Sequence, residues 1–222
     1  MYQIVTWMNC TYCNGCCIRK GIRKTVQKYQ CKSCKKYQQA VYSYRSCTTS
    51  DKQIVQLIIE GCGILGSARI LGMSPTTIIS RILKMARVLR RGTVRVGRTY
   101  QIDELFTYIG NKRNRVCIAY SIDAETGEVI DIIVRRRNKT NLQKVVSTLV
   151  LSGARRITTD KLTIYKELIP QAIHSTKFRG INKIERSNLN LRTHLKRLNR
   201  RTICYSKSLA VLTAVVKIYF WE

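Results

Sequence analysis

The chain has 222 residues, of which 45% are apolar, and carries 41 Lys and Arg against 12 Asp and Glu, a formal net charge of +29. The apolar content is enough for a packed core, and the excess positive charge, spread over the whole length, favours nucleic acid over other partners. No N-terminal segment has the pattern of a signal peptide, and the most apolar stretch, residues 208–221, is too short for a membrane span. We therefore expect a cytoplasmic, nucleoid-associated protein.

Residues 1–48 contain two cysteine pairs with the spacing of a structural zinc site. Cys10 and Cys13 form one pair and Cys31 and Cys34 the other, in the pattern C-x2-C-x17-C-x2-C. Four thiolates at this spacing suit one tetrahedral Zn²⁺ in a small antiparallel ribbon. So short a segment, with few large aliphatic residues, should depend on the metal to fold.

Cys16 and Cys17 offer an alternative within the same segment. Cys13 and Cys16 have the spacing of a pair, but using both would place three ligands within seven residues, counting from Cys10. We therefore expect Cys16 and Cys17 to stay outside the zinc site. Basic residues interleaved with tyrosines in this segment suit a DNA-binding surface, although the tyrosines could equally pack the thin core of the ribbon.

Residues 49–92 have helical periodicity and the signals of a helix-turn-helix. Ser50 is the expected N-cap of a first helix, Gly72 ends a second, and Ser74 followed by Pro75 begins a third. The turn Gly-Met-Ser between the last two helices is typical of a DNA-binding helix-turn-helix, although a plain helical hairpin has the same pattern. The polar residues expected to face DNA are Thr76, Thr77, Ser80, Arg81 and Lys84.

Residues 93–222 change to an α/β pattern. The pattern predicts a strand that ends near Asp103, two strands within 115–134 joined by a turn at 125–127, and an amphipathic helix over 140–151. A short strand over 154–160, a helix over 161–169 and a strand over 172–178 follow, and then a long basic helix from Asn182 to about Arg201. The chain as a whole is therefore expected to be an α+β multi-domain protein, with a C-terminal RNase H-like α/β catalytic domain.

Three acids in this last segment are the candidate catalytic residues. Asp103 and Asp160 are expected at strand ends and Glu185 on the basic helix, with 24 residues between the last two. An RNase H-like core uses such an arrangement to hold two divalent ions, because carboxylates are the ligands that Mg²⁺ and Mn²⁺ prefer. Glu104 should face the opposite side of its strand, and we expect Asp123, Glu125 and Glu128 to be acids of a hairpin turn.

The basic helix supplies candidate DNA contacts beside Glu185. Asn188 and Arg192 follow it at positions i+3 and i+7, on the same helical face, and Lys196 lies one turn beyond. Arg192 and Lys196 are expected to bind the phosphates near the metal ions, with Asn188 between them and Glu185.

Three stretches of the sequence resemble the insertion-sequence-1 family of bacterial DDE transposases. They are QIDEL at 101–105, TTD at 158–160 and NKIERSNLNLRTHLKRLNRRTICYSKS at 182–208. The resemblance covers essentially the whole chain, and the 24-residue interval and the basic residue seven positions after the glutamate, Arg192, match as well. It implies that Asp103, Asp160 and Glu185 form a catalytic triad that uses divalent metal to cleave the ends of an insertion sequence and to join them to target DNA.

The expected function is therefore that of a transposase. We expect it to bind double-stranded DNA, at terminal inverted repeats and at the target, as a homodimer or higher oligomer. Two alternatives remain: a DNA-binding regulator whose catalytic domain is silent, and a nuclease without strand transfer. Three intact acids in so basic a chain disfavour the regulator, whereas the nuclease shares the first chemical step with a transposase.

Overall fold

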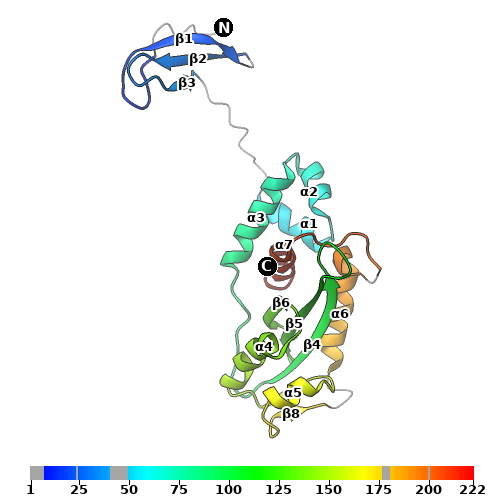
Figure 1. Ribbon diagram of the computed structural model, residues 1–222. Coiled ribbons are helices and arrows are strands. Elements are labelled where there is room, and N and C mark those ends of the chain that lie inside the picture. Colours follow the sequence, from blue (N-terminus) through cyan, green and yellow to red (C-terminus); the bar gives the residue numbers. More distant parts are fainter. Residues whose placement is uncertain (1–7, 24, 41–49, 177–180, 200) are drawn as a thin grey trace. The chain divides into compact units, whose positions relative to one another are not determined.

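The computed structural model describes residues 8–23, 25–40, 50–176, 181–199 and 201–222 (Figure 1). The chain forms two compact units, Met1–Thr48 and Thr49–Glu222. The expected strand at 172–178 and the end of the expected basic helix fall partly on residues outside the described ranges.

The first unit is a three-stranded antiparallel sheet in the order β1-β2-β3. Strand β1 (Cys17–Arg23) pairs with β2 (Val26–Cys31), and β2 pairs with β3 (Tyr37–Gln39). Its buried apolar cluster consists of Cys10, Cys17, Tyr29 and Cys31. Because so few apolar side chains are buried, a bound metal would have to supply much of the stability of this unit.

The second unit begins with three helices whose ends follow the local sequence signals. Helix α1 (Asp51–Ile59) begins at Ser50, which forms a capping box with Gln53. Helix α2 (Ile64–Leu71) ends at Gly72 in the left-handed conformation, and α3 (Pro75–Val88) begins at Ser74, whose side chain accepts a hydrogen bond from the Thr77 amide. The expected cap at Ser50 and the expected helix boundaries at Gly72 and Ser74 are confirmed.

A five-stranded sheet follows in the order β6-β5-β4-β7-β8. Strands β4 (Thr99–Tyr108), β5 (Arg115–Asp123) and β6 (Val129–Arg135) form an antiparallel meander, and β7 (Arg156–Thr158) and β8 (His174–Ser175) continue the sheet in parallel to β4. The mixed α/β class expected of this segment is confirmed.

Helices cover both faces of this sheet. Helices α4 (Lys139–Leu151) and α5 (Thr163–Leu168) pack on one face, around Ile102 and Leu149. On the other face lie α6 (Asn182–His194), the 3-10 turn η2 (Lys196–Leu198) and α7 (Leu209–Trp221). In the part of the chain that the structure describes, no helix has the length and hydropathy needed to cross a membrane.

Helix α7 joins the first three helices to the sheet. Its residues Leu212 and Val215 are almost completely buried and belong to one apolar cluster with Ile54 of α1, Ile82 of α3 and Ile118 of β5. The turn after α1 also meets α6, because a Cβ atom on Gly61 would lie 2.2 Å from the His194 carbonyl oxygen. The first three helices and one face of the sheet therefore share one core, with α7 in its middle (Figure 1).

Several expected element boundaries are wrong. Strand β4 does not end near Asp103 but continues to Tyr108, because β5 pairs with it along its whole length. The strand expected at 154–160 contains only Arg156–Thr158, and within the described part of the one expected at 172–178, residues 172–176, the strand is His174–Ser175.

The basic helix also ends earlier than expected. Helix α6 stops at His194, after which Leu195 and Leu198 are both buried by the tighter turn η2. Lys196 is therefore not on the helical face of Glu185. Helix α7 has no counterpart among the predicted elements.

Candidate active site

Asp103, Asp160 and Glu185 come from three elements of the second unit. Asp103 lies in the middle of β4, Asp160 follows the end of β7 by two residues, and Glu185 lies in the first turn of α6. Thr158 at the end of β7 pairs with Gln101 in parallel β4. Asp160 therefore leaves the sheet beside the part of β4 that carries Asp103.

The charges of the three acids interact. Burial, and to a smaller extent the negative charges of Asp160 and Glu185, raise the pKa of Asp103 from 3.8 to about 6. Hydrogen bonds from the Glu104 amide and from Asn188 act in the opposite direction. Carboxylates that repel one another in a partly buried place are arranged to bind a cation, which would relieve both the repulsion and the cost of burial.

The side chain of Asp103 is held by hydrogen bonds to both of its oxygens. The Glu104 N–H donates to Oδ1 at 2.7 Å, and Asn188 Nδ2 on α6 donates to Oδ2 at 2.6 Å. The Tyr120 hydroxyl in turn donates to Asn188 Oδ1 at 2.9 Å, which fixes the orientation of the amide. Asn188 therefore orients a candidate metal ligand, a contact that differs from the DNA-binding role expected of it from the helical face.

Gln101 joins the start of α6 to the same strand. Its buried side chain lies two residues before Asp103, and its Oε1 accepts a hydrogen bond from the Ile184 amide at 2.9 Å. This contact takes the place of a side-chain N-cap, which α6 does not have at Ile181. The hydrogen bonds of Gln101 and Asn188 therefore hold α6 against β4. One is made at the residue before Glu185 and the other three residues after it.

Glu104 lies on the face of β4 opposite to Asp103, as expected from strand alternation. The Tyr165 hydroxyl of α5 donates to Glu104 Oε1 at 2.5 Å. Burial, and then the charges of Asp160 and Asp103, raise the pKa of Glu104, while the Tyr165 hydrogen bond lowers it. Asp160 Oδ1 accepts from the Leu162 amide at 3.0 Å, just before α5. Glu104 therefore ties β4 to the helix that follows Asp160.

The other acids of the hairpin have structural roles. Asp123 Oδ1 accepts from the amides of Glu125 and Thr126 and closes the turn, and Glu125 forms an ion pair with Arg98. Glu128 accepts a hydrogen bond from the Thr93 amide. These contacts agree with their interpretation as turn acids.

The expected DNA contacts of the second unit lie on two helical segments. Arg192 is half-buried and its Nη1 donates to the Leu198 carbonyl at 3.1 Å, so it stabilises η2, while Lys196 is exposed. On α3, the side chains of Thr76, Thr77, Ser80 and Lys84 are exposed. Arg81 instead forms a two-contact ion pair with Asp51 of α1, at 2.5 and 2.6 Å, which ties the two helices together.

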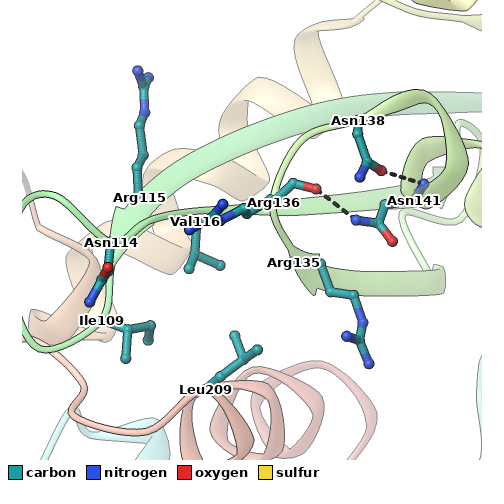
Figure 2. Close-up of a pocket in the computed structure, with 9 residues that line it drawn as sticks. All are labelled: Ile109, Asn114, Arg115, Val116, Arg135, Arg136, Asn138, Asn141 and Leu209. Atoms are coloured by element: carbon teal, nitrogen blue, oxygen red, sulfur yellow. Dashed lines mark hydrogen bonds between the residues drawn. The ribbon is translucent and has the colours of Figure 1, made fainter.

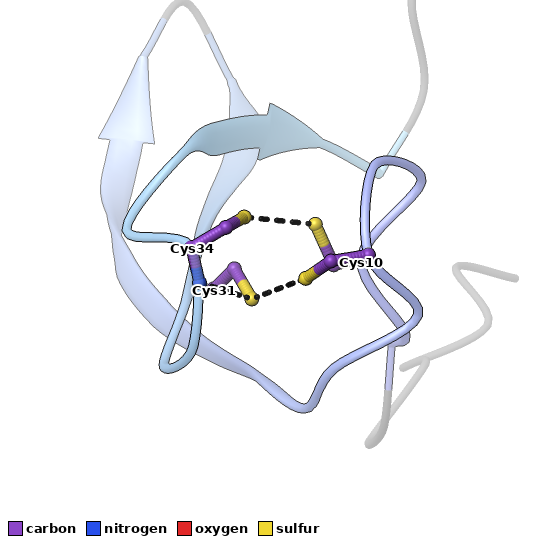
Figure 3. Close-up of side chains that lie close together, drawn as sticks. Cys10, Cys31 and Cys34 are labelled. Carbon is purple, nitrogen blue, oxygen red and sulfur yellow. Dashed lines mark hydrogen bonds between the residues drawn. The ribbon is translucent and has the colours of Figure 1, made fainter.

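The four expected zinc ligands meet in the first unit. The ligand atoms of Cys10, Cys13, Cys31 and Cys34 all lie within 4.8 Å of one another, and the Cys10–Cys34 and Cys13–Cys31 sulfur distances are 3.5 and 3.4 Å. Figure 3 shows the sulfur atoms facing one another between two loops. Tetrahedral zinc with bonds of about 2.3 Å requires sulfurs roughly 3.8 Å apart, so the cluster fits a zinc ion with little adjustment.

Both cysteine pairs are built in the same way. The residue after each pair, Asn14 or Lys35, has a positive φ, of 57° and 59°. The amide of each donates to the carbonyl of the first cysteine of its pair, at 2.9 and 3.1 Å. The Cys34 amide also donates to the Cys31 sulfur at 3.5 Å, and this hydrogen bond is the largest cause that lowers the pKa of Cys31 to about 6. A low pKa favours the thiolate that binds zinc.

Cys16 and Cys17 do not belong to this cluster. Cys16 is exposed, whereas Cys17 is buried at the start of β1. Burial, and then negative charge on Cys31 and Cys10, raise the pKa of the Cys17 thiol. Cys17 therefore packs as a neutral thiol beside the cysteine cluster.

The three acids do not gather around one metal position. Among the described residues, the cysteine cluster is the only group of three or more His, Cys, Asp or Glu close enough to hold one metal ion. A site for two divalent ions would need carboxylates spread around both ions rather than around one point.

Comparison with known proteins identifies the family. Residues 98–221, which include all three acids, match the family model described as IS1 transposase. The chain therefore belongs to the IS1 transposase family.

Two individual relatives and one solved structure show how similar single proteins are to this chain. The insertion element iso-IS1n protein InsB of Shigella dysenteriae is 29% identical over 116 residues, covering 52% of this chain and 88% of the relative. The insertion element IS1 protein InsB of Shigella flexneri is 29% identical over 119 residues, covering 54% and 91%. Among solved structures, the HTLV-2 integrase catalytic core domain in complex with magnesium is 15% identical, with a TM-score of 0.34 and coverage of 58% of this chain and 86% of that one.

Proposed function

We propose that this protein is a DDE transposase that binds the terminal inverted repeats of an insertion sequence, cleaves the ends and joins them to target DNA. The observation that carries the proposal is that Asp103 is close enough to Asp160 and Glu185 for their charges to add to the larger effect of burial, which together raise its pKa. Membership of the IS1 transposase family supports it.

Asp103, Asp160 and Glu185 would hold the divalent ions. Mg²⁺ bound there would supply Lewis acidity, which stabilises charge on the phosphate and activates the attacking water or 3′-hydroxyl. The protein contributes the fixed positions of its ligands: Asn188 and the Glu104 amide orient the Asp103 carboxylate, and the Gln101 contact places the first turn of α6. Carboxylates held in this way do not have to reorganise when the substrate arrives.

The remaining surfaces would bind the DNA. We propose that α2 and α3 act as a helix-turn-helix, with Thr76, Thr77 and Ser80 exposed toward DNA, and that the zinc-bound ribbon of residues 1–48 assists it. Arg81 would take part only by leaving its ion pair with Asp51. Because two transposon ends must be held together for joining, the active form is proposed to be a dimer or a higher oligomer.

The proposal is tested by incubating the purified full chain with Mg²⁺, a target plasmid and labelled DNA from the sequences that flank its gene. The wild type should nick the labelled ends and join them to the plasmid, and Asp160→Asn should do neither while it still binds DNA. Glu167→Gln is the matched control, because Glu167 is an exposed acid that pairs only with Lys139 among the described residues. It should behave as the wild type.

The outcomes separate the proposal from its alternatives. DNA binding without any metal-dependent nicking by the wild type would favour a regulator with a silent catalytic domain. Nicking without joined products would favour a nuclease. Equal activity of wild type and Asp160→Asn would show that these acids are not the catalytic group.

A further inference from the structure

Three arginines line a cavity at the end of the sheet where β6 ends and β5 begins (Figure 2). The cavity has a volume of about 440 Å³, and its polar lining consists of Arg115, Arg135, Arg136, Asn114, Asn138 and Asn141. We call this site the arginine pocket. It contains none of the residues described above as candidate catalytic, zinc-binding or DNA-binding residues.

The positive charge of the arginine pocket is not neutralised within the described part of the protein. No acid lines the cavity, and none of the ion pairs among described residues involves Arg115, Arg135 or Arg136. The Arg115 guanidinium lies over the Phe106 ring, 4.0 Å from its centroid, and Arg137 lies 5.2 Å from the same ring. Contact with an aromatic face holds a guanidinium in place but leaves its charge available to an anion.

The start of α4 adds to this positive region and fixes part of it. Asn138 is the N-cap of α4, and its Oδ1 accepts from the Asn141 amide at 2.8 Å. Asn141 Nδ2 in turn donates to the Arg136 carbonyl at 2.8 Å. The backbone that carries the arginines is thus attached to the N-terminal end of a 13-residue helix, where the helix dipole favours negative charge.

The directions of the side chains suit an extended anion rather than a small one. In Figure 2 the side chains of Arg115 and Arg135 point away from each other, from two neighbouring strands. One phosphate ion could not contact both guanidinium groups, whereas successive phosphates of a nucleic acid backbone could. Guanidinium is also the cation whose planar geometry matches phosphate oxygens best.

The arginine pocket lies within reach of DNA bound at the candidate active site. Phe106 of β4 pairs with Cys117 of β5, which pairs with Arg135 of β6. Phe106 is three residues beyond Asp103 on the same strand, and Arg135 lies two strands away from it. With about 3.4 Å per residue and about 4.8 Å per strand, the backbone at Arg135 is roughly 14 Å from that at Asp103. That distance corresponds to about four base pairs of B-DNA at about 3.4 Å per base pair.

We propose that the arginine pocket binds the phosphodiester backbone of the double-stranded DNA that is cleaved or joined at the acids, a proposal that rests on the proposed function. The contact positions the DNA a few base pairs from the reacting phosphate and reads no sequence, because it is made to phosphates rather than to base edges.

The test replaces Arg135 and Arg136 together with Gln and measures DNA binding by the full chain over a series of salt concentrations. Arg115 is left in place because it packs on Phe106. The slope of log K against log salt should become less steep by about 1.8, since each phosphate contact contributes about 0.9. The matched control replaces Arg155 and Arg156, two exposed arginines at the start of β7, with Gln, which removes the same charge elsewhere and should leave the slope within about 0.5 of the wild type, less than one contact.

One further variant makes the result decisive. The double replacement of Arg135 and Arg136 with Lys keeps the charge and should restore most of the slope, which a merely structural defect would not allow. An unchanged slope in the Gln double variant, or the same loss in the control, would overturn the proposal.

Failure of this proposal is distinguishable from failure of the proposed function. The binding measurement needs neither metal nor cleavage. A reduced slope in a protein that never nicks DNA would support DNA binding by the arginine pocket and contradict the proposed transposase function. Normal nicking with an unchanged slope would support the proposed function and contradict DNA binding by the pocket.

Discussion

Replacing Asp103 with Asn should stabilise the metal-free protein at neutral pH while it abolishes the proposed chemistry. The reason is that the pKa of Asp103 is raised in the folded state, so the folded protein binds a proton at this residue more readily than the unfolded chain does. The unfolded chain ionises Asp103 near pH 3.8, whereas the folded one does so near pH 6. As the pH rises from about 4 to 6, the ionised carboxylate therefore destabilises the fold, and above pH 6 this cost is fully present.

The size of the effect follows from the difference between the two pKa values. A difference from 3.8 to about 6 corresponds to about 3 kcal/mol at pH 7, with 1.36 kcal/mol for each pH unit. Asn keeps the hydrogen bond from the Glu104 amide to Oδ1, but its NH₂ group meets that of Asn188, so one hydrogen bond worth about 1 kcal/mol has to rearrange or is lost. The expected net stabilisation at pH 7 is therefore about 2 kcal/mol.

The assay is urea unfolding of the full chain at pH 7 and at about pH 4, in buffer without Mg²⁺ and with the ribbon zinc retained. Asp103→Asn should be more stable than the wild type at pH 7, and the difference should shrink as the pH approaches 4. Millimolar Mg²⁺ should stabilise the wild type at pH 7 but not the variant, because ions that bind only the folded state raise its stability.

Glu167→Gln serves as the control here as well, since Glu167 is exposed and pairs only with Lys139 among the described residues, and it should show neither effect. If Asp103→Asn were less stable than the wild type at pH 7, or equally stabilised at both pH values, the proposed electrostatic strain among the three acids would be refuted.

Three further predictions concern other parts of the molecule. Asn188→Ala should reduce metal-dependent nicking by about 10–100-fold and leave DNA affinity unchanged; a loss of affinity with normal nicking at saturating DNA would instead support the DNA-binding role first expected of Asn188. Cys31→Ser should release the zinc and unfold residues 1–48 without changing the unfolding of residues 49–222, whereas Cys16→Ser should keep one zinc per chain; metal analysis and circular dichroism measure both, and zinc retained by Cys31→Ser would move the ligand assignment to Cys16 or Cys17. Leu212→Ala in α7 should cost about 2–5 kcal/mol and lower the stability of helices α1–α3 and of the sheet together, because α7 packs on both; hydrogen exchange that protects either part as in the wild type would show that residues 49–92 fold separately.

The features predicted correctly from the sequence are those decided by neighbouring residues. The caps at Ser50 and Ser74 and the helix end at Gly72 rest on hydrogen bonds and backbone conformations within one turn. The two cysteine pairs also use local geometry, since each pair closes a turn of its own. Such signals are readable without knowing which elements become neighbours.

The side chains that hold the candidate site in place could not be predicted from their neighbours in the sequence. Gln101 and Asn188 act through partners 83 and 85 residues away in the chain, and nothing near them in the sequence marks these contacts. The local pattern ends β4 too early because the length of this strand is set by pairing with β5, and it ends α6 too late because burial of Leu195 and Leu198 overrides helical periodicity. The pattern does not predict α7, because its apolar residues face a core on several sides and show no single buried stripe.

The sequence by itself therefore determined the kinds of chemistry available to this protein. Scarce carboxylates in a basic chain, cysteines in pairs and the family motifs point to metal ions and DNA. The tertiary structure alone decided how those groups are held and what surrounds them: Asp103 beside Asp160 and Glu185, Asn188 directed at a carboxylate rather than outward, and Arg115, Arg135 and Arg136 around one pocket. The physical reason is that ionisation, hydrogen bonding and burial at a site depend on groups brought together by sheet pairing and helix packing, and those contacts join residues far apart in the chain.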